Sequence, residues 1–275
     1  HTTGGIQPNE IGIKIDGFQP EGKFAMSGKT LGGLIGLLET NGIVEVTNSA
    51  ANVGTGTGTT HLGGLVGECW TSTKTAYRVS DTVYVKATDG LQAVGYPGSD
   101  VEGTVALDVT KIVDGTFSTP IEDVLSVTAP SALTVSDNAK LDGASLIYTE
   151  AGDNQEVKFL WNGQELYSAM VNVEQKDLTN DANVTITGVN STYPSDKVAA
   201  KAEIDVIYNG VKLVEGTDYT VAQGNNKFTI TFQGNYTGFA EKPYSVEENA
   251  LVVTAADYNG TYDGKEHSIT VDAPE

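Results

Sequence analysis

Short segments of alternating hydrophobic and polar residues make up most of the chain, and Gly, Asn, Asp and Pro separate them. This alternation is typical of β-strands that bury one face, and the separating residues are typical of turns. No segment of convincing length places hydrophobic residues at the i, i+3, i+4 and i+7 positions of an amphipathic helix. We therefore predict an all-β fold.

A glycine-rich hexapeptide repeats in the N-terminal third. LGGLIG at residues 31–36 recurs as LGGLVG at residues 62–67, a shift of 31, and a degenerate copy, LQAVG, occupies residues 91–95. One such unit cannot bury its own hydrophobic face, so we predict that neighbouring copies stack on one another. Leu, Ile and Val would point inward, and the glycines would allow close backbone approach and positive φ at tight corners. An alternating segment follows each copy, at residues 42–46, 75–79 and 103–107.

The Gly-Gly-Leu-(Ile/Val)-Gly core, at a spacing near 30 residues, resembles the GLUG motif of bacterial adhesins and surface-anchored proteases. The resemblance covers residues 25–115. GLUG repeats usually carry an Asn-(Ser/Cys)-Tyr element after the glycines, whereas this chain has Thr47, Asn48, Ser49 and Ala50 there. The resemblance implies a glycine-rich β-solenoid, or β-helix-like, region over residues 1–115.

Residues 116–175 lack the repeat but keep strand character, and we predict a β-sandwich-like segment there. Asn162 and Gly163 separate two alternating runs. Asn-Gly supplies the two positive-φ residues of a type I′ turn, so this stretch is the strongest hairpin signal in the chain. Trp161, beside the turn, is interpreted either as a platform for a carbohydrate or as a core residue, and the core is the favoured reading.

Three tyrosine motifs follow in the C-terminal part: YNG at residues 208–210, GTDYTV at 216–221 and GNYTG at 234–238. Their order closely resembles that of the MBG/YDG group of bacterial immunoglobulin-like repeats, over residues 176–248. The resemblance implies an immunoglobulin-like β-sandwich domain.

The last 27 residues, 249–275, echo the start of that domain. Val253, Thr254 and the TYDG at 261–264 correspond to residues 184–185 and 192–195, each at a shift of 69. This shift is about the length of one small sandwich domain. We therefore predict a truncated further repeat, a cut end at His1, and further domains of the same polypeptide beyond this segment.

Acidic residues dominate the charge: 36 Asp and Glu stand against 16 Lys and Arg, for a net charge of −20. The only arginine is Arg78. Nucleic-acid binding depends on clustered basic residues, so the charge argues against a nucleic-acid partner and against attraction to anionic membranes. The sequence also lacks an apolar run of the roughly 20 residues needed to span a bilayer.

Residues that could carry catalysis are few and scattered. Cys69 is the single cysteine, which excludes an intrachain disulfide and favours a buried, hydrophobic role. Histidines occur only at positions 1, 61 and 267 (His1, His61 and His267), without zinc-ligand spacing. No Gly-x-Ser-x-Gly elbow is present. We predict no catalytic, cofactor-binding or metal-binding residues and no enzymatic activity.

Two further motifs have simpler interpretations. Gly28, Lys29 and Thr30 match the end of a phosphate-binding loop, but Lys23 occupies the position of its earlier glycine and no helix is expected to follow. Structural calcium is left open at two Asp/Asn-rich turns, which turn propensity explains equally well. These turns contain Gly152, Asp153 and Asn154, and Asn180, Asp181, Ala182 and Asn183.

The resemblances together imply a non-catalytic segment of a secreted, Gram-positive-type surface protein. It would act in adhesion or as a structural stalk on the bacterial cell surface. One alternative is a specific binding module for a host glycan or an immunoglobulin, and another is the non-catalytic flank of a surface hydrolase. The partners would be a host surface glycan or protein, and the ligand-binding residues are not predicted.

Overall fold

The described part of the chain consists of β-strands, turns and one short 3-10 segment, with no α-helix among these residues. The predicted all-β fold is therefore confirmed. Contacts divide the chain into two compact units, here called unit 1 (His1–Lys176) and unit 2 (Asp177–Glu275). The computed structural model describes residues 10–20, 27–39, 42–54, 59–69, 76–193, 204–246, 254–255, 259–267 and 271–272.

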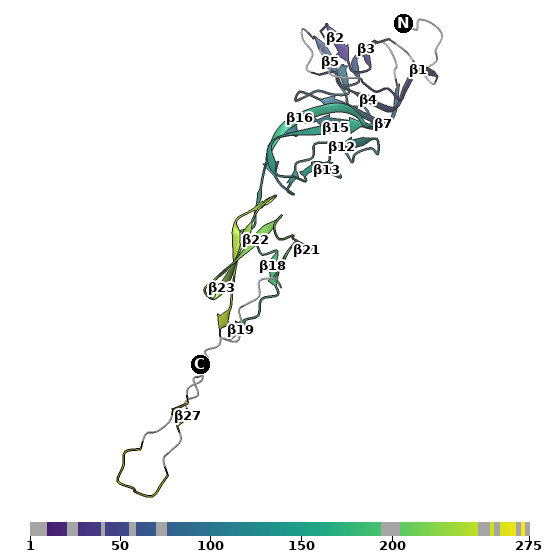
Figure 1. Ribbon diagram of the computed structural model, residues 1–275. Helices are drawn as coiled ribbons and strands as arrows, with labels where there is room; N and C mark the ends of the chain where they lie inside the picture. Colours follow the sequence, from purple (N-terminus) through teal and green to yellow (C-terminus); the bar gives the residue numbers. More distant parts are fainter. Residues whose placement is uncertain are drawn as a thin grey trace. The chain divides into compact units, whose positions relative to one another are not determined.

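Unit 1 opens with parallel strands. Its largest sheet has the order β1-β4-β7-β9, all parallel, and Figure 1 shows β4 beside β7. Two shorter parallel ladders, β2-β5 and β3-β6-β8, contain the glycine hexapeptides. The bounds are β1 Ile11–Asp16, β2 Thr30–Gly32, β3 Ile35–Leu38, β4 Ile43–Ala51, β5 His61–Gly63, β6 Val66–Cys69, β7 Ala76–Lys86, β8 Val94–Tyr96 and β9 Thr104–Asp108, followed by the 3-10 segment η1 Val109–Lys111.

The three copies of the glycine repeat pair in register. Leu31 lies opposite Leu62, and Ile35, Val66 and Val94 form one continuous ladder. Because Val94 belongs to the degenerate copy, that copy is a structurally equivalent third rung. Buried hydrophobic residues of successive rungs pack into one core cluster. The predicted repeat character is confirmed.

The hexapeptide positions require glycine because backbone segments approach each other closely there. A Cβ atom on Gly63 would lie 1.8 Å from the carbonyl oxygen of Val66 and 2.5 Å from the amide nitrogen of Gly95. No side chain fits at such distances. None of the glycines of the three copies has a positive φ. The predicted close approach is therefore confirmed, and the positive φ predicted for these glycines is wrong.

Positive φ occurs instead at one equivalent position within or directly beside each of the four strands of the largest sheet. Asn48 and Asp81 lie opposite each other between paired residues of β4 and β7, while Gly17 directly follows the last pair of β1 with β4 and Gly103 directly precedes the first pair of β7 with β9. The next residue in the two central strands, Ser49 or Thr82, is fully buried. Its hydroxyl donates to the carbonyl oxygen two residues earlier, at 2.7 Å and 2.8 Å respectively. The left-handed residues are Gly17 (φ 68°), Asn48 (45°), Asp81 (44°) and Gly103 (85°).

The rest of unit 1 is mainly antiparallel. Its sheets have the orders β10-β16-β15-β12 and β11-β14-β13. The long β15–β16 hairpin turns at Asn162 (φ 47°) and Gly163 (φ 80°), which confirms the hairpin predicted from Asn-Gly. The bounds are β10 Gly115–Thr116, β11 Pro120–Ile121, β12 Leu133–Val135, β13 Ala139–Asp142, β14 Ser145–Tyr148, β15 Gly152–Trp161 and β16 Gln164–Glu174.

One hydrophobic cluster joins the two halves of unit 1. Val83 and Leu107, from the parallel sheet, belong to the same cluster as Phe159 and Trp161 of β15. Asn52 adds a hydrogen bond from its side-chain amide to the carbonyl oxygen of Leu166, at 2.9 Å. Residues 1–115 and 116–175 thus share a core, while the predicted four-part division of the chain stays a prediction.

Unit 2 contains two antiparallel sheets, β18-β20-β21 and β22-β23-β25. β19 and β26 pair in parallel. The core cluster is rich in aromatic residues and includes fully buried Phe228 and Ile230. The bounds are β17 Lys176–Asp177, at the unit boundary, then β18 Val184–Thr187, β19 Thr192–Tyr193, β20 Asp205–Tyr208, β21 Val211–Lys212, β22 Tyr219–Gly224, β23 Lys227–Phe232, β24 Tyr236–Thr237, β25 Phe239–Pro243, β26 Ser245–Val246, β27 Thr254–Ala255 and β28 Val271–Asp272.

Part of the predicted further repeat at 249–275 lies outside the described residues. β27 and β28 pair antiparallel, and Tyr262 is 94% exposed. His1, Lys23 and Val253 also lie outside the described residues.

Candidate functional site

His61 lies in a polar and aromatic cluster on the stacked part of unit 1. Its Nδ1 atom is 3.0 Å from Oε2 of Glu68, and its ring stacks on Tyr96 with 4.5 Å between centroids. The hydroxyl of Thr30 donates to the same Glu68 oxygen at 3.1 Å. The hydrogen bond to His61 holds the pKa of Glu68 below its ordinary value, and the bond from Thr30 adds to this effect.

The repeat register assembles this cluster. Thr30 pairs with His61 across β2 and β5, and Glu68 pairs with Tyr96 across β6 and β8. Three successive rungs therefore contribute one or more side chains each. Because Thr30 donates to Glu68 and not to His61, the histidine is not placed to deprotonate this hydroxyl as a general base would. The geometry indicates that these side chains hold neighbouring rungs together.

Cys69 is buried, at 8% exposure, within the core cluster of the stacked part. Its predicted role as a buried, hydrophobic residue is confirmed. The neighbouring Tyr77 hydroxyl is buried without a conventional hydrogen-bond partner in the described part of the chain. Burial raises the pKa of Tyr77, and the nearby Cys69 thiol, a weak hydrogen-bonding group, adds to the shift.

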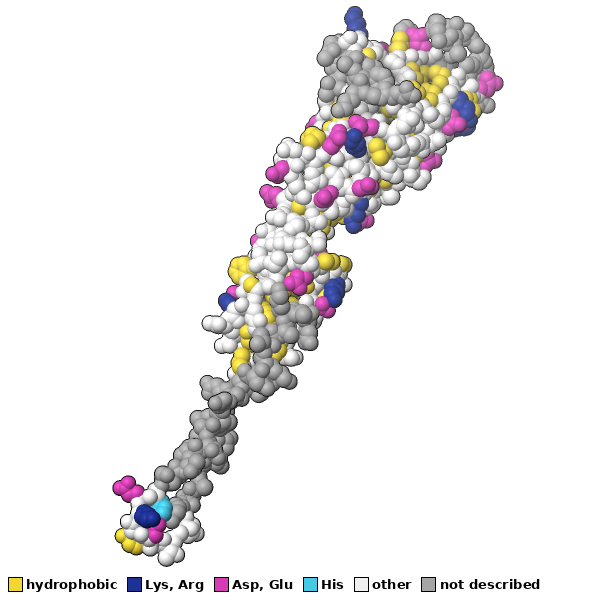
Figure 2. All heavy atoms as spheres, in the orientation of Figure 1, with side chains coloured by type: hydrophobic (Ala, Val, Ile, Leu, Met, Phe, Trp, Pro, Cys, Tyr) yellow, Lys and Arg dark blue, Asp and Glu magenta, His cyan; other side chains and the backbone are white. Residues whose placement is uncertain are grey.

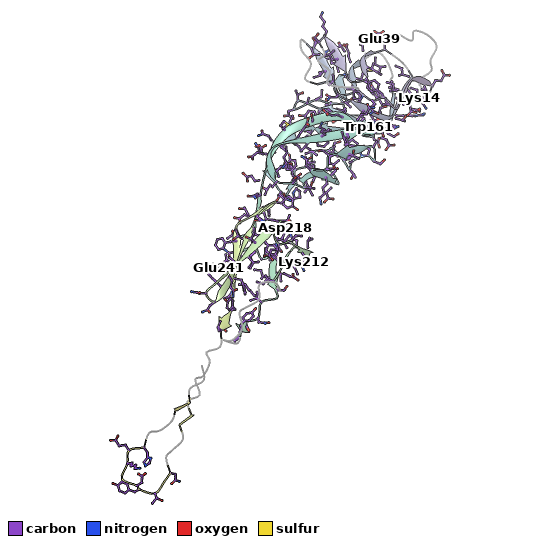
Figure 3. The ribbon with its side chains drawn as sticks, in the orientation of Figure 1. Lys14, Glu39, Trp161, Lys212, Asp218 and Glu241 are labelled. Carbon is purple, nitrogen blue, oxygen red and sulfur yellow. The ribbon has the colours of Figure 1, made fainter. Side chains whose placement is uncertain are left out.

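Trp161, which is labelled in Figure 3, is 1% exposed and belongs to the core of unit 1. The interpretation as a core residue is confirmed, and a surface platform is excluded for this side chain. Its indole nitrogen has no hydrogen-bond partner among the described residues. Gln19, from the stacked part, donates its side-chain amide to the carbonyl oxygen of Trp161 at 3.0 Å.

The stretches considered for nucleotide and calcium binding form ordinary local structure. Thr30 begins strand β2, so no helix follows Gly28 and Lys29. Asp181 accepts hydrogen bonds from the backbone and side-chain nitrogens of Asn183, at 2.8 Å and 3.0 Å. Such an Asx turn explains that stretch by turn propensity. Within the described ranges, no three His, Cys, Asp or Glu side chains gather as a metal site would require.

Basic side chains in the described part are commonly held by acidic ones. Ion pairs join Lys14 to Glu45 at 2.8 Å and Lys86 to Asp108 at 2.8 Å. Figure 2 shows acidic and basic side chains interspersed on the visible face. Arg78 is exposed and pairs in register with Glu45 on β4. This arrangement does not form the basic stripe that phosphate backbones require.

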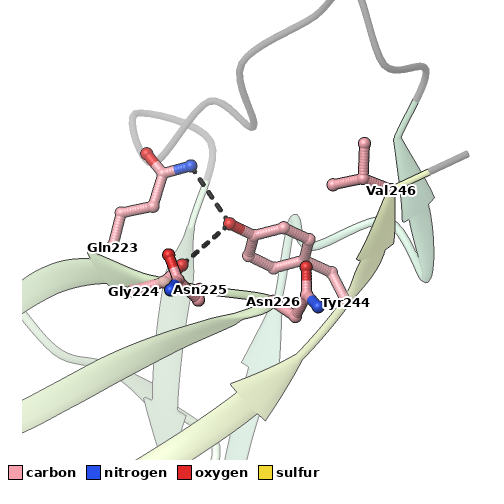
Figure 4. A pocket seen from close by; sticks show the side chains of 6 residues that line it. All are labelled: Gln223, Gly224, Asn225, Asn226, Tyr244 and Val246. Atoms are coloured by element: carbon pink, nitrogen blue, oxygen red, sulfur yellow. Dashed lines mark hydrogen bonds between the residues drawn. The ribbon is translucent and has the colours of Figure 1, made fainter. Parts of the chain in front are cut away.

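A polar groove lies at the turn between β22 and β23 of unit 2 (Figure 4). It is an open hollow of about 600 Å³. The turn residue Asn226 has φ 59°. Sequence reasoning missed this groove, although two adjacent asparagines after an alternating run are a turn signal. The lining residues are Gln223, Gly224, Asn225, Asn226, Tyr244 and Val246.

The groove has a fixed aromatic wall. The backbone nitrogen of Tyr244 donates to the carbonyl oxygen of Asn226 at 2.9 Å. Its hydroxyl donates to the carbonyl oxygen of Gly224 at 3.0 Å and accepts from the side-chain amide of Gln223 at 3.2 Å. The ring therefore has little freedom to move.

The second histidine in the described part, His267, contacts Asp263 with 2.8 Å between Nε2 and Oδ1. This hydrogen bond lowers the pKa of Asp263, and a bond from the backbone nitrogen of Lys265 adds to the effect. The contact spans four residues of one exposed segment, so it represents local structure.

No family model matches this sequence, and neither a curated protein nor a solved structure is significantly similar to it. No helix in the described part of the chain is long and apolar enough to cross a membrane.

Proposed function

We propose that this chain is a non-catalytic segment of a secreted, Gram-positive-type bacterial surface protein that acts in adhesion or as a structural stalk. The observation that carries the proposal is the in-register parallel stacking of the glycine repeat. Each rung adds roughly 4.8 Å of height, so length is built by repetition. Surface proteins use such repetition to hold a binding surface away from the cell.

The finer architecture belongs to the same proposal. The stacked part of unit 1 is a β-solenoid of the GLUG type, and the domain proposed at residues 176–248 is an immunoglobulin-like sandwich of the MBG/YDG type. The parallel ladders and the two antiparallel sheets of unit 2 support these assignments. The net charge of −20 suits a protein that remains soluble when exposed outside the cell.

Single-molecule pulling on the full chain tests the stalk function. We expect separate unfolding events for the two units. At about 3.5 Å per residue, unit 1 would release roughly 60 nm of chain and unit 2 at most about 35 nm. Unfolding of unit 1 as one event would show that its two halves share load through their common core. Loss of both units without measurable resistance would contradict a stalk.

Specific binding of a host ligand is the second candidate function. The Tyr244 groove favours it, because the groove presents an aromatic ring and several uncharged amides at a rigid turn. An array of glycans and a pull-down with immunoglobulin G would separate the two ligand classes.

A further inference from the structure

We infer that the groove between the β22–β23 turn and Tyr244 binds one ring of a neutral saccharide. The inference deepens the proposed adhesive function and rests on it for biological meaning. Its physical basis is independent of the stalk, because every lining residue belongs to unit 2.

The first step of the argument is pre-organisation. Tyr244 is anchored to the turn at both ends of its side chain by the three hydrogen bonds described above. Phe228, which is fully buried, supports the ring at 5.0 Å between centroids, and Tyr193 meets it edge-on at 5.3 Å. A ligand would therefore meet a wall that is already ordered, which lowers the entropic cost of binding.

The second step concerns the hydrogen-bonding groups that remain for a ligand. Asn225 and Asn226 are exposed, and their side-chain amides make no hydrogen bond within the described part of the chain. Each amide offers two donors and one acceptor. Saccharide hydroxyls both donate and accept, so neighbouring hydroxyls on one sugar ring match such a pair of amides. The positive φ of Asn226 sets the direction of its Cα–Cβ bond at the turn.

The third step is the apolar contact. The ring of Tyr244 and the side chain of Val246 line the same hollow, as Figure 4 shows. The face of an aromatic ring carries partial negative charge and attracts polarised C–H groups. One face of a pyranose ring presents a row of such C–H groups. A groove with a ring on one side and amides on another therefore fits a sugar better than a purely apolar ligand.

The fourth step is charge. All six lining residues are uncharged. Lys227, next to the turn, is held by Glu241 at 2.6 Å and is therefore not free to attract an anion. The overall charge of −20 repels acidic ligands. A neutral sugar is therefore preferred to an acidic one. Because the site covers about one ring, we expect a Kd on the order of 1 mM.

Saturation-transfer NMR on the full chain tests the inference. The probes are the methyl glycosides of glucose, galactose, mannose and N-acetylglucosamine, together with methyl glucuronide as the acidic counterpart of the glucoside. We expect transfer to at least one neutral glycoside and a clearly weaker signal for the glucuronide. The double variant Asn225→Ala, Asn226→Gly removes both amides, and glycine keeps the positive φ of the turn. It should weaken binding about tenfold.

Asn162→Gly is the control, because Asn162 is also a left-handed turn asparagine, at the first turn position of the β15–β16 hairpin of unit 1, whereas Asn226 is the second turn residue of its own hairpin. It should bind the glycoside like the parent chain, and circular dichroism should show all variants folded. Three results would overturn the inference: no transfer to any neutral glycoside, undiminished binding by the double variant, or equal binding of glucuronide. If sugar binding fails while both units still resist pulling, the stalk proposal survives. Loss of that resistance alone leaves the groove assignment standing.

Discussion

The stacked part of unit 1 and the sheets of unit 2 reach the same all-β state by different routes. In the stacked part, β4 and β7 pair residues 33 positions apart, and the repeat supplies each partner. In unit 2, β22 and β23 pair around a tight turn, with Gly224 opposite Lys227. Register is thus set by a repeated sequence in one region and by local turn chemistry in the other.

This difference determines which substitutions each region tolerates. A rung of the stack touches the rung before and the rung after it, so a residue such as Gly63 must satisfy neighbours far away in sequence. A hairpin in unit 2 depends mainly on its own turn and on the core beneath it. Both tryptophans, Trp70 and Trp161, lie in unit 1. Tryptophan fluorescence therefore reports on unit 1 alone, and each unit can be followed separately.

The largest expected effect is that of Gly63→Ala. The new Cβ atom would overlap backbone atoms of two rungs, which cannot move aside as a flexible side chain would. We expect a loss of roughly 4 kcal/mol or more from the free energy of unfolding of unit 1. Urea titration followed by tryptophan fluorescence measures it, while the unit 2 transition should not move.

Gly143→Ala is the control for this substitution. Gly143 has φ 63°, but a Cβ atom at this position would meet no other atom within 4 Å. Only the left-handed conformation is strained, at about 1–2 kcal/mol. Equal costs for the two variants would show that the stack does not need its glycines for close approach.

Ile230→Ala tests the other region. Ile230 is fully buried in the core of unit 2, and its truncation should cost about 3 kcal/mol through lost burial and a cavity. Two-dimensional NMR of unit 2 resonances during denaturation would follow the loss. The tryptophan transition should stay within about 0.5 kcal/mol of the parent, as for independent sites. A larger shift would show that the two units do not unfold independently.

Ser49→Ala and Thr82→Val compare two equivalent buried hydroxyls within the stack. Ser49 donates to the carbonyl oxygen of Thr47 and also accepts from the backbone nitrogen of Phe18, at 3.1 Å. Its loss leaves a backbone donor of the neighbouring segment without that partner. We expect about 2 kcal/mol for Ser49→Ala and about 1 kcal/mol for Thr82→Val, measured by tryptophan-monitored denaturation. The reverse order would contradict a bridging role for Ser49.

The smallest effect concerns pH. The folded-state pKa of Glu68 is lowered, so the unfolded chain binds this proton more readily than the folded chain. The stabilisation is complete above the ordinary pKa of 4.5 and is lost as the pH falls through the lower folded value. Glu68→Gln should therefore reduce the loss of unfolding free energy that unit 1 shows as the pH falls below 4.5. Glu122→Gln, which removes an exposed carboxylate elsewhere in unit 1, should leave this pH dependence unchanged.

The sequence predicted the features that repeat or that depend on a local conformation. The hexapeptides predicted the stacking of Leu31 on Leu62, and Asn162 with Gly163 predicted the hairpin. Both signals are short and contiguous, so they are visible without knowledge of the fold. The buried state of Cys69 and Trp161 also followed from residue type and context.

Other features depend on residues that meet only in three dimensions. Asn48 and Asp81 occupy one left-handed position of the stack, but the residue type there varies among Asn, Asp and Gly, so no single residue type marks the position in the sequence. The shared core of Val83 and Trp161 joins segments nearly 80 residues apart. The groove needs Tyr244 beside a turn about 20 residues earlier, and alternation alone does not show that contact.

Disulfide trapping tests the in-register stack most directly. In a Cys69→Ala background, Glu45→Cys with Arg78→Cys joins residues that lie opposite each other on β4 and β7. Parallel neighbours are about 4.8 Å apart, within the range that a disulfide spans. Glu45→Cys with Ser80→Cys uses the same face but is displaced by two residues, to roughly 8 Å. We predict rapid oxidation of the first pair and little of the second; equal or reversed trapping would contradict the stack.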